Sequence, residues 1–277
     1  MNKLFIALSL LIASSLSAAF HARPDDIEIV VVIPSYNNGP YVEENLKSLF
    51  KQEYTKWQLI YLNDASTDST RSEVLRCIHK YKMQKKCVVV HNKERLGAMA
   101  NLYHAIHAVA PHKVIVQIDG DDILKHNKVL SRVAKTYRNK NIWITYGNYE
   151  SFPKNAPGWF NDTCHAFPIE VIQKADFRNY TWVAYPLRTF YAKLFHNIKT
   201  EDLKYNGQFF PVVSDTAMMH PMFEMAANGH IHYEKEVLYI YRVNTGINDF
   251  YLRKPLMDEL SNYIKALPKY PALNQLF

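Results

Sequence analysis

Glycine is scarce in this chain: there are 8 glycines among 277 residues, and no glycine-rich loop follows the first predicted strand. Dinucleotide-binding and Walker-type sites need such a loop, because backbone N–H groups must come close to the phosphates. The sequence therefore excludes both of these phosphate-binding patterns. A phosphate bound near this strand would have to be met by a metal ion and by basic side chains.

Cysteine is scarcer still, and the three cysteines, Cys77, Cys87 and Cys164, show neither zinc-ligand spacing nor a catalytic pattern. If the chain is exported, Cys77 and Cys87 could form a disulfide; the alternative is that both are small buried hydrophobic residues. There is no RNA-binding aromatic pattern, and the basic residues behind the net charge of +7 are scattered. We therefore expect an anionic small substrate or surface as partner, and no nucleic acid.

Long apolar runs are absent except at the N-terminus. Lys3 precedes the apolar run Leu4–Ala13, and Ser14–Ala22 is rich in small residues. This pattern predicts a targeting segment over residues 1–22, either a cleaved signal peptide or an uncleaved signal anchor. The chain is then expected to be exported or in the secretory pathway, with membrane association through the N-terminus in the second case. Residues 23–277 form the functional domain.

Apolar runs alternate with helical periods along the first half of the remaining chain. This alternation predicts an α/β fold with a Rossmann-like, doubly wound, mostly parallel sheet, whose regular part spans residues 27–146. Residues 147–277 form a less regular half. The predicted strands are 27–33, 57–62, 87–90, 114–118, 142–146 and 237–243. The predicted helices are 42–50, 70–81, 99–109 and 215–227, the last with Ser214 as its N-cap. A further short, basic helix is predicted from Lys254.

Three polar loops, Ser35–Gly39, Asn63–Ser69 and Asp119–Asp122, follow three of the predicted strands. In a doubly wound sheet the carboxyl ends of the strands share one rim, where ligands bind. Gly120 separates Asp119 from Asp121 and permits a tight turn that lets both carboxylates converge. Hard oxygen ligands of this kind suit Mg²⁺ or Mn²⁺, whereas the alternative interpretation of an Asp-Gly sequence is a plain surface turn.

The segments Val30-Val-Val-Ile-Pro-Ser-Tyr-Asn37, Asn63-Asp64-Ala-Ser-Thr-Asp68 and Asp119-Gly-Asp121-Asp122 resemble, in this order, the successive motifs of inverting family 2 glycosyltransferases with the GT-A fold. The resemblance is strong over residues 28–130 and looser to about residue 250. It implies a metal-dependent enzyme that moves a sugar with inversion from a nucleotide donor, most often UDP-linked. The acceptor, whether glycan, lipid or protein, is not implied.

By this resemblance, Pro34 and Tyr36 pack on the nucleobase, with the Tyr36 ring stacked on it. Asp64 corresponds to the carboxylate that accepts a hydrogen bond from the base; its alternative role is a helix N-cap. Arg95 lies in a stretch that approaches the base and the diphosphate, or else is a solvated loop charge. Asp68 is expected to cap the helix that starts near residue 70.

Asp119 and Asp121 fall on the metal and ribose positions of the family. Asp121 is expected to coordinate the Mn²⁺ or Mg²⁺ directly, and Asp119 to lie nearer the ribose. Asp122 either supports these two residues or caps the turn. The acidic residue that deprotonates the acceptor corresponds to Asp215; the alternative is an ordinary acid in the first turn of a helix.

The sequence departs from the family at the third metal ligand. Many members carry a histidine after the strand that follows the catalytic helix, but residues 241–249 contain none. Arg242, Asn244 or Asn248 could replace it. His220, within the helix itself, is expected to pack rather than to bind metal.

Two further functions remain open from the sequence. The leader suggests an exported, non-catalytic relative that binds glycans or a protein partner, because nucleotide sugars are absent from a bacterial periplasm. A nucleotidyltransferase would share the sheet, but it usually carries a glycine-rich, basic loop after the first strand, and Ser35–Pro40 is not of that kind.

Overall fold

The computed structural model describes residues 27–154, 164–243, 245–246 and 252–277. The targeting segment predicted over residues 1–22 lies outside the described residues, as do Asn244 and Asn248. Within the described ranges, no helix is both long enough and apolar enough to cross a membrane.

An eight-stranded mixed sheet forms the centre of the protein, in the order β3-β2-β1-β4-β7-β6-β10-β5. Strands β1 to β4 pair in parallel, and β7 runs antiparallel between β4 and β6. The predicted mostly parallel sheet is confirmed, and both halves of the chain contribute to it. Its strands are β1 (Ile29–Ser35), β2 (Trp57–Asn63), β3 (Cys87–His91), β4 (Val114–Gln117), β5 (Ile123–Leu124), β6 (Ile144–Phe152), β7 (Arg188–Tyr191) and β10 (Ile231–Arg242); β8 (Lys204–Tyr205) and β9 (Gln208–Phe209) pair separately.

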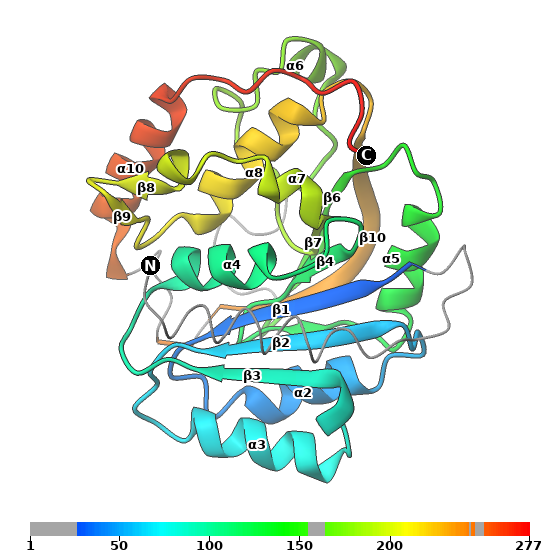
Figure 1. Cartoon of the computed structure of the whole chain (residues 1–277), viewed down its shortest axis with the longest axis vertical. Coiled ribbons are helices and arrows are strands. Elements are labelled where there is room, and N and C mark those ends of the chain that lie inside the picture. Colours follow the sequence, from blue (N-terminus) through cyan, green and yellow to red (C-terminus); the bar gives the residue numbers. More distant parts are fainter. Residues whose placement is uncertain (1–26, 155–163, 244, 247–251) are drawn as a thin grey trace.

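Helices cover both sides of this sheet. In Figure 1, β1, β2 and β3 lie between α4 above them and α2 and α3 below them. Because both faces are covered, these strands carry continuous apolar runs, and every residue of β2 is buried. The helices are α2 (Val42–Phe50), α3 (Thr70–Lys80), α4 (Ala98–His107), α5 (Val129–Tyr137), α6 (Ile169–Gln173), α7 (Ala192–His196), α8 (Ser214–Met225) and α10 (Lys254–Ala266), with 3₁₀ turns η1 (Gln84–Lys86) and η2 (Thr200–Leu203).

The end of the first strand was predicted too early, at Pro34. Strand β1 continues to Ser35, with Pro34 opposite Leu62 of β2. Pairing of β1 with β4 ends at Val32, so Pro34 has a strand neighbour on one side. Because proline has no backbone N–H group to donate, it is tolerated at a position that is paired on one side only.

The second half departs further from the prediction. Strand β6 extends to Phe152 instead of ending at Tyr146, and β10 begins at Ile231 rather than at Val237. These two strands pair in parallel with each other over their full length, with two irregularities. Backbone pairing therefore maintains strands where polar residues interrupt the apolar pattern, since strand preference depends on context.

One smaller prediction about local structure is wrong, and one open alternative is decided. Ser214 is the first residue of α8 rather than its cap, and the preceding Val213 has a φ of 53° in the left-handed region. Cys77 and Cys87 do not form a disulfide, because both are free thiols. Burial raises the pKa of Cys87 to about 12, so that this thiol is unreactive at neutral pH.

A buried ion pair fastens the C-terminal segment to α8. Arg178 and Glu224 have side chains 3% and 0% exposed, with Nε to Oε1 at 2.5 Å and Nη2 to Oε2 at 2.9 Å. Arg178 also donates to the Ile264 carbonyl at the end of α10, and Glu224 accepts from the Tyr270 N–H. This network fixes α10 against α8.

Glu224→Gln should lower the free energy of unfolding by about 3 kcal/mol or more, because it leaves the Arg178 charge buried and uncompensated. Urea denaturation followed by circular dichroism measures this change. As a control, Asp258→Asn breaks the exposed pair with Lys254 on α10 and should cost less than about 1 kcal/mol. Equal effects of the two substitutions would show that the buried pair does not hold the segment.

Candidate functional site

A cleft of about 540 Å³ opens where β1, β2 and β4 end. The polar residues after these strands converge there, as expected for a doubly wound sheet. The opposite side of the cleft comes from the start of α8 and from α10. All the residues that the sequence predicted for the site line this cleft: Pro34, Tyr36, Asp64, Arg95, Asp119, Asp121 and Asp215.

Asp68 joins the loops after β1 and β2. Its Oδ2 accepts the Gly39 N–H, and its Oδ1 accepts the Thr70 N–H, both at 2.9 Å. Burial opposes the charged form, but the hydrogen bonds from Thr70 and Gly39 hold the pKa of Asp68 below its usual range. Ser69 is the N-cap residue of α3, but Asp68 accepts the first N–H of the helix, and the same carboxylate also fixes the loop after β1.

Asp64 holds the loop before α4 rather than capping α3. Its Oδ1 accepts from Asn92 Nδ2 at 2.8 Å and from the Leu96 N–H at 2.9 Å, and its Oδ2 accepts the Gly97 N–H at 2.8 Å. The residue is 4% exposed and lines the cleft. A carboxylate has about four acceptor positions, so one more donor can be accommodated.

Arg95 is engaged with Tyr36. Its guanidinium carbon lies 3.8 Å from the centre of the Tyr36 ring, in a cation–π contact. Arg95 is also an exposed loop residue, so its charge is solvated as well as stacked on the ring. The contact joins the loop after β1 to the loop before α4, so two predicted site residues from separate loops lie together.

Asn45 of α2 fixes the turn that carries the aspartates. Its buried side-chain amide donates to the carbonyl of Asp119 at 3.0 Å and to that of Asp122 at 2.6 Å. The Tyr239 hydroxyl accepts the Asp119 N–H at 3.0 Å. Neither Asn45 nor Tyr239 was predicted, because an amide within a helix and a tyrosine within a strand carry no local signal of such a role.

Gly120 is required by a close approach and not by an unusual backbone angle. It is absent from the positive-φ glycines. A Cβ atom at this position would lie 2.4 Å from Asn38 Nδ2 and 2.7 Å from Ser35 Oγ. The absence of a side chain therefore lets the turn after β4 lie directly against the loop after β1.

The aspartates of the turn lie in an environment that disfavours their charge. Burial raises the pKa of Asp119, with Arg188 opposing the shift. Burial and the Asp119 charge raise the pKa of Asp121 to about 6. A bound divalent cation relieves such crowding, and hard carboxylate oxygens are the ligands it prefers, so Asp119 and Asp121 fit an Mg²⁺ or Mn²⁺ ion.

Asp122 and Arg242 brace this turn. Asp122 is buried, does not line the cleft, and accepts the Arg242 N–H at 2.7 Å. The Arg242 side chain donates through Nε to the Asp121 carbonyl at 3.0 Å and pairs through Nη2 with Glu44 at 2.5 Å. These contacts give Arg242 a structural role in bracing the turn.

His220 packs, as expected. It is 4% exposed on α8, and its ring lies edge-on to Trp182 with the ring centres 5.4 Å apart. Burial lowers its pKa to about 3, which keeps the imidazole neutral.

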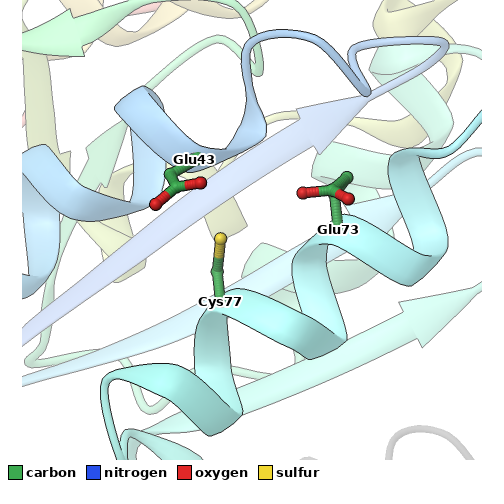
Figure 2. Close-up of side chains that lie close together, drawn as sticks. All are labelled: Glu43, Glu73 and Cys77. Carbon is green, nitrogen blue, oxygen red and sulfur yellow. The ribbon is translucent and has the colours of Figure 1, made fainter.

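A second group of potential metal ligands, Glu43, Glu73 and Cys77, lies between α2 and α3 (Figure 2). Both carboxylates are already paired: Glu43 with Lys80 at 2.5 Å and Arg76 at 2.6 Å, and Glu73 with Arg76 at 2.6 Å. Hydrogen bonds from Lys80 and Arg76 lower the pKa of Glu43 to about 2, and burial raises that of the Cys77 thiol. The group is an ion-pair network that joins two helices.

Asp215 is held by an arginine that the sequence analysis missed. Arg188 of β7 is 7% exposed; its Nη2 donates to Asp215 Oδ2 at 2.9 Å, and its Nε donates to the Ala184 carbonyl at 2.8 Å. Asp215 Oδ1 accepts the Thr216 N–H at 2.8 Å. A single charge in the apolar stretch 187–191 was a usable signal, because a buried arginine requires a partner.

Comparisons with known proteins agree with this geometry. The family model described as glycosyl transferase family 2 matches residues 30–210. Glycosyltransferase GlyG of Streptococcus pneumoniae is 28% identical over 229 residues, which are 79% of this chain and 71% of GlyG. The UDP-Glc:alpha-D-GlcNAc-diphosphoundecaprenol beta-1,3-glucosyltransferase WfgD of Escherichia coli is 30% identical over 132 residues, 48% of this chain and 49% of WfgD. The chain thus spans about half the length of WfgD.

Solved structures share the fold at lower identity. Residues 1–349 of TarS from S. aureus, in complex with UDP-GlcNAc, match with a TM-score of 0.59 and 18% identity over 79% of this chain and 60% of that one. The mannosyltransferase PcManGT from Pyrobaculum calidifontis, in complex with GDP-Man and Mn²⁺, matches with a TM-score of 0.59. The identity is 17% over 96% of this chain and 73% of PcManGT. The expected GT-A fold is confirmed.

Gly120→Ala should lower the free energy of unfolding by about 1–3 kcal/mol and weaken Mn²⁺ binding, because the added methyl group pushes the aspartate turn away from β1. Thermal denaturation and calorimetry with Mn²⁺ alone measure the two effects. Gly207→Ala is the control. Its φ of +78° costs about 1 kcal/mol of backbone strain, but an added Cβ atom would have no other atom within 4 Å. Unchanged Mn²⁺ affinity in Gly120→Ala would disprove the role of the close approach.

Proposed function

Because the chain belongs to glycosyl transferase family 2, we propose that it transfers a sugar from a UDP-linked donor to an acceptor hydroxyl, with inversion and with a bound divalent cation. One observation carries the proposal: the residues expected to bind nucleotide, metal and acceptor line a single cleft. The nucleotide side of that cleft lies at the ends of β1 and β2, the aspartate pair follows β4, and Asp215 lies in the first turn of α8.

A uridine base suits the nucleotide side. Tyr36 offers an aromatic face for stacking, and Asp64 retains an acceptor position for the imide N–H of uracil. Arg95, now stacked on Tyr36, carries a positive charge beside the base position, within reach of a diphosphate. WfgD is named for UDP-Glc, and the TarS complex contains UDP-GlcNAc, which supports a UDP-linked donor.

Asp119 and Asp121 are the residues that would hold the cation, with Asp119 also facing the ribose. Mn²⁺ or Mg²⁺ supplies Lewis-acid neutralisation of the charge that develops on the departing diphosphate. The structures of PcManGT and of glucosyl-3-phosphoglycerate synthase from Mycobacterium tuberculosis contain Mn²⁺, which supports a divalent cation in this fold.

Asp215 serves as the base in this proposal. Its carboxylate takes the proton of the acceptor hydroxyl, and the acceptor oxygen bonds to the anomeric carbon on the face opposite the diphosphate. The bond from the anomeric carbon to the diphosphate oxygen breaks, and UDP leaves with the electron pair. Arg188 fixes the orientation of Asp215 through Oδ2, as a productive geometry requires.

Family membership favours this enzyme over a non-catalytic glycan- or partner-binding relative and over a nucleotidyltransferase. Export through residues 1–22 remains a proposal, and mass spectrometry of the mature N-terminus tests whether the leader is cleaved. Calorimetry with UDP and Mn²⁺ separates the functions, since a non-catalytic relative without a donor site would bind neither.

Asp215→Asn should lower kcat for release of UDP by about 10²–10⁴-fold, because the acceptor proton loses its base, while the affinity for UDP with Mn²⁺ stays the same. Asp121→Asn should weaken Mn²⁺-dependent UDP binding by about 10-fold or more. A coupled assay with a panel of UDP-sugars, together with calorimetry, measures both.

Asp258→Asn, at an exposed ion pair on α10, is the matched control and should leave both quantities unchanged. If neither Asp215→Asn nor Asp121→Asn alters turnover of an accepted donor, the assigned roles are wrong.

A further inference from the structure

One wall of the cleft is aromatic and is not used by the nucleotide side. Tyr149 of β6, Trp182 and Tyr185 of the segment before β7, and Tyr241 near the end of β10 all line the cleft, together with Asp215. We call these four residues the aromatic wall. They come from the less regular second half of the chain, and none of the four was a predicted site residue.

The rings of the aromatic wall are held in place by one another and by the sheet. Tyr149 lies 5.2 Å from Tyr185 and 5.7 Å from Tyr241 between ring centres, in tilted and edge-on arrangements. Trp182 packs edge-on against His220 of α8. The Gly147 N–H donates to the Tyr185 carbonyl at 3.1 Å, which anchors the segment to β6. Such mutual packing reduces the entropy lost when a ligand binds.

The segment that carries Trp182 and Tyr185 also positions the proposed base. The Ala184 carbonyl, between the two rings in sequence, accepts from Arg188 Nε, and Arg188 Nη2 holds Asp215. His220, which contacts Trp182, follows Asp215 on α8 by about one and a half helical turns. A ligand placed against these rings therefore lies beside Asp215.

We propose that the aromatic wall is the acceptor subsite and that its ligand is a neutral sugar, one of whose hydroxyls faces Asp215. This inference rests on the proposed function. The C–H face of a pyranose is apolar while its hydroxyls point outward, so it matches amphipathic rings edged by polar groups.

Other acceptor classes fit the described lining less well. An anionic acceptor needs free cations, but the basic side chains among the described lining residues are Arg95, which stacks on Tyr36 at the nucleotide side, and Arg188, which is paired with Asp215. An apolar lipid chain laid along the wall would cover Asp215 and Arg188 without replacing their hydration. A neutral sugar needs no free cation, and its hydroxyls can replace the water around Asp215 and Arg188.

Trp182→Leu and Tyr185→Leu test this subsite in the full-length protein. Each should raise KM for neutral glycoside acceptors by about 10-fold or more, because the stacking surface is lost. The affinity for UDP with Mn²⁺ should stay within about 2-fold, since a neutral leucine leaves the charges of the cleft unchanged. The acceptor panel consists of p-nitrophenyl glycosides, 3-phosphoglycerate and a serine peptide, and saturation-transfer NMR measures direct binding to the UDP–Mn²⁺ complex.

Tyr263→Leu is the matched control, because this ring is 39% exposed on α10 and does not line the cleft. It should change none of these quantities. The inference is overturned if wild type binds no neutral glycoside, if it prefers 3-phosphoglycerate or the peptide, or if both leucine variants keep the wild-type acceptor KM. Failure of the proposed function is separate: wild type would then bind no UDP and hydrolyse no UDP-sugar.

Discussion

The direct contact of Gly120 with the loop after β1 is the constraint on which the site depends. Without a side chain at Gly120, the aspartate turn lies against Ser35 and Asn38, and a methyl group there would collide with both. The parallel pairing of β1 with β4 brings the two strand ends to the same rim. The contact then sets how close the aspartates lie to the nucleotide side of the cleft.

Charge is distributed around this contact in a consistent way. Burial raises the pKa values of Asp119 and Asp121, and the Asp119 charge adds to the shift at Asp121, while Arg188 pairs with Asp215 across the cleft. Arg242 braces the turn from behind and pairs with Glu44. The protein thus leaves two carboxylates in the cleft undercompensated, which is a condition that a divalent cation with a diphosphate relieves.

The second half of the chain completes the cleft by docking onto the same sheet. Strand β7 inserts next to β4 and brings Arg188 to the site, and α8 brings Asp215 to face it. The buried Arg178–Glu224 pair holds α10 in position, and α10 closes the cleft with Met257 and Ser261. The stability of the C-terminal segment and the shape of the cleft are therefore linked.

The sequence by itself determined the nucleotide half. Apolar runs and the polar loops after them predicted β1 to β4 and their shared rim, because these signals are local and a strand covered on both faces must be apolar. The resemblance to the family motifs then added site residues outside those loops, among them Arg95 and Asp215. The tertiary structure decided what depends on distant partners: the Arg188–Asp215 pair, the role of Asn45, the extent of β6 and β10, and the aromatic wall. These features join residues far apart in the chain, so a local pattern can at most flag one member, as the charge of Arg188 does, while burial and pairing in the folded sheet decide which residues meet.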